Sequence, residues 1–208
     1  MSLTRRLLVA AALTAALATP AAARGRLERL ELTLGTLIGS GDIGSIRGMS
    51  AGLHTEVSKH FGDIGIVGQY DLLGVGEDPT LNGKKDPIRG LEHRLGVSAR
   101  YTIGRVGKDF INADFWAEAG LGREFIQWDA GGKLTRDDIT LAIGAHPVFT
   151  VGKQRYIGYF LAFRMNIAES PDAKFELPAV CAGPCDEPTP PSPTDISFFF
   201  NFGITFGK

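Results

Sequence analysis

The sequence predicts an all-β chain that folds as an up-and-down antiparallel transmembrane β-barrel of about eight strands, preceded by a cleaved signal peptide. Segments of roughly 10 to 14 residues alternate between apolar and polar residues, which suits strands that cross a bilayer at a tilt. The links between these segments alternate between short and long. After the N-terminal segment, no run reaches the roughly 18 apolar residues of a transmembrane helix, so any crossing must use strands.

Residues 1–23 have the pattern of a secretory signal peptide, with Arg5 and Arg6 followed by an apolar run and then small residues. Its removal leaves residues 24–208 as one predicted barrel domain. Loss of the two arginines from the 22 basic residues leaves 20 against 23 acidic ones, a net charge of −3. Because the chain also lacks a dense basic patch, we expect no nucleic-acid partner.

The first three strands are predicted over residues 30–38, 49–61 and 64–72. In each, alternate residues are apolar, such as Leu53 and Val57, whereas the positions between them are glycine, polar or charged, such as Glu56. Gly62 and Asp63 are typical of a tight turn, so the second and third strands should form a hairpin.

The remaining five strands are predicted over residues 91–103, 111–121, 139–145, 157–167 and 195–208. The sixth should bulge or end early at Pro147, because proline cannot donate a hydrogen bond to a ladder. The last has the most regular alternation, and its apolar face carries Ile196, Phe198, Phe200, Phe202, Ile204 and Phe206. With no helix after it to cover this face, it must meet a protein core or lipid.

The connections provide the most discriminating evidence. Short links are expected at 62–63, 104–109 and about 152–155, and longer ones after the first, third, fifth and seventh strands, the last two at 126–138 and 169–195. Short turns at one end and long loops at the other are typical of bacterial outer-membrane barrels, which have the turns in the periplasm. An even strand number places both termini on the periplasmic side.

The C-terminal residues are similar to the signal that the barrel assembly machinery reads in outer-membrane proteins. Asn201, Gly203 and Phe206 fall in its register, whereas Lys208 stands where an aromatic residue is usual. The whole mature chain resembles the small eight-stranded outer-membrane β-barrel proteins of the OmpA/OmpX type. This resemblance implies the outer membrane of a Gram-negative bacterium, periplasmic chaperones and the assembly machinery as partners during biogenesis, and contact with outer-membrane lipid and lipopolysaccharide. We expect a monomer.

An eight-stranded barrel is just wide enough for side chains to fill its lumen. The polar faces of the predicted strands carry charged residues that should pair across this space: Glu56, Glu92, Arg94, Arg100, Asp114, Glu118 and Arg164. We expect the centre of this network where Glu92, Arg94 and Arg100 on one strand face Asp114 and Glu118 on the next. The predicted role is structural or in surface interaction, with no catalytic residues, cofactor or metal.

Three other functions are consistent with the sequence. Inward glycines and an excess of acids over arginines would suit a narrow, cation-leaning pore. A lipid A-modifying enzyme would need a histidine with a serine and an acid, but Ser98 falls on the opposite face to His93, the predicted lipid-facing histidine. A soluble periplasmic, lipocalin-like barrel would turn its apolar faces inward around a ligand, and alternation alone does not say which face is inside.

The segment 169–195 is predicted to be a long extracellular loop. It contains seven of the eleven prolines and both cysteines. Because the compartment is oxidising, we expect Cys181 and Cys185 to form a disulfide. The loop could contact a surface partner, but its sequence does not specify one.

Overall fold

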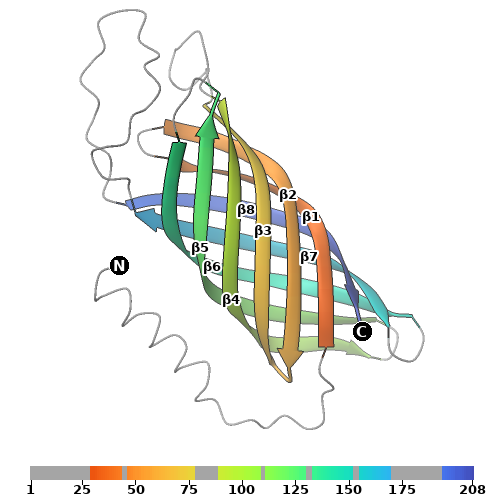
Figure 1. Ribbon diagram of the computed structural model, residues 1–208. Helices are drawn as coiled ribbons and strands as arrows, with labels where there is room; N and C mark the ends of the chain where they lie inside the picture. The colour runs from red at the N-terminus through yellow and green to blue at the C-terminus, as the bar shows by residue number, and fades with distance from the viewer. Residues whose placement is uncertain are drawn as a thin grey trace, which may run out of the picture.

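The computed structural model describes residues 29–43, 46–77, 89–108, 111–129, 133–151, 155–169 and 194–208. They form a closed barrel in which eight antiparallel strands follow one another in sequence order (Figure 1). The strands are β1 (Arg29–Ile43), β2 (Ile46–Phe61), β3 (Ile64–Glu77), β4 (Arg89–Lys108), β5 (Ile111–Trp128), β6 (Lys133–Thr150), β7 (Tyr156–Glu169) and β8 (Thr194–Gly207). The predicted all-β, up-and-down barrel is confirmed.

The barrel has two ends that differ in their connections. The start of β1 and the end of β8 lie at the same end as the β2–β3 turn, which we call the turn end (Figure 1). We call the opposite end, where β3 leads towards β4, the loop end. Closure of β1 onto β8 leaves no open sheet edge, so the backbone groups of every strand have ladder partners on both sides.

The seam between β1 and β8 depends on glycine. Gly35 and Gly203 face each other across it, and a Cβ on Gly203 would lie 2.7 Å from the carbonyl oxygen of Leu34. The two backbones therefore approach closely because neither position has a side chain. Beyond β8, Lys208 continues the ladder, since its N–H and C=O both bond to Leu30 at 3.1 Å.

The predicted long link at 126–138 is wrong. β5 continues to Trp128 and β6 begins at Lys133, and the two pair from Gln127 and Lys133 onwards. Likewise, only residues 44–45 separate β1 from β2, so the predicted long link after the first strand is also wrong. The expected length difference holds for the segments between β3 and β4 and between β7 and β8.

Pro147 neither ends β6 nor shifts its register. It pairs with Ala113 of β5, and β6 continues to Thr150. The ladder to β7 is interrupted at His146 and Pro147, then resumes in the same register. The one register shift recorded for the described strands lies between β4 and β5, where Ile103 is an extra residue between Thr102 and Gly104.

Some predictions fall outside the described residues. They are the signal peptide at 1–23, the disulfide between Cys181 and Cys185, and most of the loop at 169–195. Within the described part of the chain, no helix is long and apolar enough to cross a bilayer.

Candidate functional site: the closed lumen and the outer face

Arg100 of β4 forms the centre of the lumen. Its guanidinium donates two hydrogen bonds to Glu56 of β2, at 2.7 and 2.6 Å, and one to Glu118 of β5, at 2.8 Å. The guanidinium also lies over the ring of Trp116, 4.1 Å from its centroid, and near Phe160 of β7. Arg100 is only 3% exposed, so this buried cation is matched by two carboxylates and two aromatic faces.

A second arginine, Arg94, lies fully buried towards the loop end. It donates to both carboxylate oxygens of Asp138 on β6, at 2.9 and 2.7 Å, and lies 3.4 Å from Asp71 of β3. Arg164 of β7 reaches the same Asp71 carboxylate at 2.7 Å. Four strands are thus linked across the lumen by two arginines and two aspartates.

The seven residues predicted for the lumen network are all buried, but they do not form one cluster. Glu56 and Glu118 meet at Arg100, as described above. Asp114 instead lies near the turn end, where it accepts hydrogen bonds from Arg29 and Arg105. Glu92 has one carboxylate oxygen without a hydrogen-bond partner in the described structure. The predicted single centre of the charge network on β4 and β5 is therefore wrong. Asp114 and Glu92 lie outside the group around Arg100, because arginine side chains reach across the barrel to other strands.

Several lumen partners were not predicted. Asp138 lies in the predicted link at 126–138 and Glu124 lies just before it, yet Glu124 accepts a 2.5 Å hydrogen bond from Arg136 of β6. Arg136 also donates to Asp195 at 2.5 Å and so links β6 to β8. Continued odd and even alternation beyond residue 121 could have placed these side chains inside.

A histidine group occupies the turn end of the lumen. His60 Nε2 lies 3.1 Å from Glu31 and 3.2 Å from the hydroxyl of Ser58, and Tyr156 donates to the same carboxylate. A serine, histidine and acid relay needs the two partners on different ring nitrogens. Here both contacts use Nε2, and Nδ1 has no hydrogen-bond partner in the described structure, so the group has no relay geometry. His54 is likewise paired with acid, its Nδ1 2.6 Å from Asp71.

The outer face carries the large apolar side chains. Leucine, isoleucine, valine and phenylalanine residues on all eight strands are exposed there, including Val97 at 60% and Phe200 at 54%. This orientation is the opposite of that required by the lipocalin-like alternative. His93 also faces outwards, where its Nδ1 lies 2.8 Å from the hydroxyl of Tyr70, whereas Ser98 points inwards to Glu118.

Apolar side chains join the charged pairs inside the barrel at the loop end. Inward positions there are occupied by a buried group that we call the apolar cap: Leu37, Leu73, Val75, Ile126, Trp128, Leu134 and Phe199. Outward positions on the same ends of β5 and β6 are mostly polar, although Phe125 is 40% exposed, and Arg123 donates two hydrogen bonds to Asp137 at 2.7 and 3.2 Å on the exposed surface. The lumen is thus mainly polar at the turn end, and at the loop end it combines the apolar cap with charged pairs.

The three residues of the predicted assembly signal alternate between the faces of β8. Asn201 and Gly203 point into the lumen, and Phe206 lies on the outer face, 44% exposed. They are thus arranged as strand residues of the closed barrel.

Neither protein-family models nor curated proteins match this sequence. Solved structures, in contrast, do match this chain. Neisserial surface protein A (NspA) matches with a TM-score of 0.46 and 13% identity, over 86% of this chain and 95% of that chain. Ail, the attachment invasion locus protein of Yersinia pestis in complex with the heparin analogue sucrose octasulfate, matches with a TM-score of 0.43 and 14% identity, over 88% of this chain and all of that chain. The outer membrane protease OmpT from Escherichia coli matches with a TM-score of 0.33 and 9% identity, over 87% and 96% of the two chains.

Proposed function

We propose that this chain is an integral outer-membrane protein whose lumen is plugged by side chains, with a structural or surface-interaction role. The observation that carries the proposal is the polarity of the turn-end part, where charged residues such as Arg100 are buried and apolar residues such as Phe200 are exposed. Water would not support such a surface, since exposed apolar patches of this extent normally meet lipid or another protein. The lipid then surrounds the turn-end part, and the loop end projects into water.

The lumen network has the role of a plug and a brace. Its arginines connect strands that are not neighbours, such as β2 to β4 through Arg100 and Glu56. A carboxylate in the lumen without a partner would be costly, so the pairs stabilise one strand arrangement over others. Lipid and lipopolysaccharide are the proposed contacts of the outer face, and the barrel is proposed to be a monomer.

We propose that signals near the two ends of the chain direct its biogenesis. Residues 1–23 direct export, and Asn201, Gly203 and Phe206 form the signal for the assembly machinery, which the chain reaches with periplasmic chaperones. Both termini lie in the periplasm, and the segment 169–195, with its Cys181–Cys185 disulfide, is extracellular.

A narrow pore is the second candidate. In the described lumen, nine acids are buried, against four buried arginines and the half-buried Arg29 and Arg105. This excess of acid would favour cations. Against conduction, Trp116 and Phe160 fill the middle of the lumen and the apolar cap fills its loop end.

Refolding and fractionation test the proposal. The urea-unfolded protein should insert into phosphatidylcholine vesicles and migrate on a gel at a position that changes on heating, and the protein in cells should fractionate with the outer membrane. Recovery in the soluble periplasm without detergent would rule out the membrane function.

Conductance measurements separate the plugged barrel from the pore. In planar bilayers the refolded protein should produce no channel events above background, and steady cation-selective steps would favour the pore instead.

A further inference from the structure

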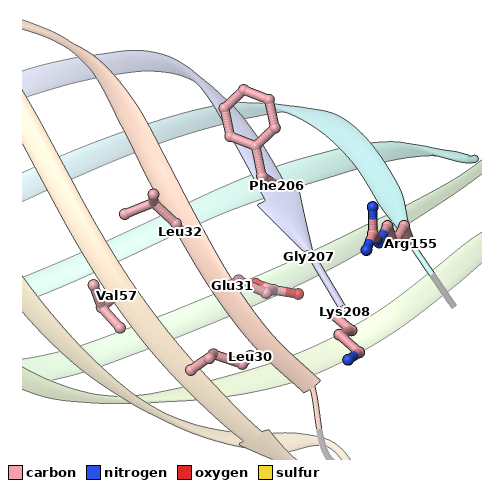
Figure 2. Close-up of a pocket in the computed structure, with 8 residues that line it drawn as sticks. All are labelled: Leu30, Glu31, Leu32, Val57, Arg155, Phe206, Gly207 and Lys208. Carbon is pink, nitrogen blue, oxygen red and sulfur yellow. The ribbon is translucent and has the colours of Figure 1, made fainter.

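A hollow of about 420 Å³ lies on the outer face at the turn end, beside the seam of β1 and β8. Its apolar wall is formed by Leu30 and Leu32 of β1, Val57 of β2 and Phe206 of β8. Figure 2 shows the basic residues Arg155 and Lys208 together on the opposite side, next to the end of β8. The hollow thus combines an apolar wall with a basic rim.

The rim has cationic groups available to a ligand. Within the described residues, neither Arg155 nor Lys208 forms a recorded ion pair. These two cationic side chains can attract an anion.

Glu31, the acid at this hollow, does not oppose an anion. Its carboxylate points into the lumen, where Ser58 donates to it and His60 lies 3.1 Å away. Glu31 is only 2% exposed, so the carboxylate is shielded from the outer face. Gly207 lies between Phe206 and Lys208 in the lining, and the ring of Tyr156 fills the place that a side chain would take there.

We propose that this hollow binds one anionic phospholipid, with an acyl chain against Leu30, Leu32, Val57 and Phe206 and the phosphate beside Arg155 and Lys208. The apolar wall and basic rim match the two parts of such a lipid, and the site lies at the end of the apolar surface, where headgroups meet hydrocarbon. The inference rests on the proposed membrane function. In that orientation the turn end faces the periplasmic leaflet, where the available lipids are phospholipids.

Lipid retention on the whole refolded barrel tests the proposal. The mature protein is refolded in detergent, given equal amounts of dioleoyl phosphatidylglycerol and dioleoyl phosphatidylcholine, and examined by native mass spectrometry. The variants are R155Q/K208Q, which removes the rim charges, and V57W, which fills the hollow and leaves the charges. The matched control is R89Q/K133Q, which removes two exposed basic residues at the loop end. Heat-dependent gel mobility reports folding for each.

The wild type and the loop-end control should retain one phosphatidylglycerol in preference to phosphatidylcholine. R155Q/K208Q should lose this preference by about thirtyfold, in line with the combined contribution of two basic residues near an anionic surface. V57W should also lose bound lipid, which a site for the phosphate alone would not do. Equal retention of both lipids by a folded wild type, or unchanged preference in folded R155Q/K208Q, overturns the proposal. A wild type that fails to fold into detergent or vesicles contradicts the membrane function itself.

Discussion

The turn-end and loop-end parts of this barrel fill the lumen with different side chains. In the turn-end part, Arg100 is buried between carboxylates while Val97, three residues earlier on the same strand, is 60% exposed. In the loop-end part, Trp128 is 2% exposed and Arg123 lies on the surface. Both parts bury charged pairs, but on β5 and β6 of the loop-end part large apolar residues also turn inwards.

Replacement of Arg100 by methionine should have the largest effect. It would leave Glu56 and Glu118 buried without their cation, and breaking a buried ion pair from one side costs about 3–5 kcal/mol. Denaturant unfolding in lipid vesicles measures the change in the free energy of unfolding. The triple variant with Glu56→Gln and Glu118→Gln should recover part of the loss, and no recovery would argue against a charge network.

Leu73→Ala should be the next most damaging substitution. Leu73 is fully buried in the apolar cap, and loss of a buried leucine costs about 2–5 kcal/mol. Its neighbour Leu72 points outwards, so Leu72→Ala is the matched control and should cost much less. Equal losses in the two variants, measured by the same unfolding experiment, would show that the cap is not a packed core.

Val97→Arg compares the outer faces of the two parts. An arginine among the lipid-facing residues near the bilayer midplane should destabilise the folded barrel by about 2–4 kcal/mol. Thr135→Arg, on the exposed outer face at the loop end, should cost about 0–1 kcal/mol. If the folded barrel tolerates an arginine at Val97 in vesicles, this position does not face lipid.

Arg123→Met should have the smallest effect. It leaves Asp137 without this arginine on the exposed surface, where water can solvate the carboxylate. We expect no measurable change in stability at moderate salt. A large loss would mean that this pair lies within hydrocarbon, and that the boundary between the two parts is nearer to the loop end.

Much of the fold could be predicted from alternation. Every second residue from Ile196 to Phe206 is apolar, and this pattern identified β8 because lipid contact requires a continuous apolar face. The same rule failed at residues 126–138, since it assumes that the apolar side stays outside. Ile126 and Leu134 are apolar and point inwards, so the alternation no longer marked an outward apolar face there.

The sequence predicted which side chains face the lumen but not which of them pair with each other. The alternation of odd and even positions placed Arg94 and Asp114 on the inward side, and both are buried. It could not indicate that Arg94 would reach Asp138 on β6, or that Asp114 would meet Arg29. The partners depend on the stagger of the strands and on the reach of each side chain across the lumen, and neither appears in a local pattern.

The sequence by itself determined the class of fold, the number of strands and the face of each side chain in the turn-end part, because strand geometry alternates with period two. Only the closed structure decided how far the strands extend, where large apolar residues turn inwards and which charges pair. These depend on residues far apart in the chain, such as Arg136 and Asp195 or Leu30 and Lys208, which meet once the barrel closes. Closure also created the hollow beside Arg155, since its walls come from both ends of the described chain.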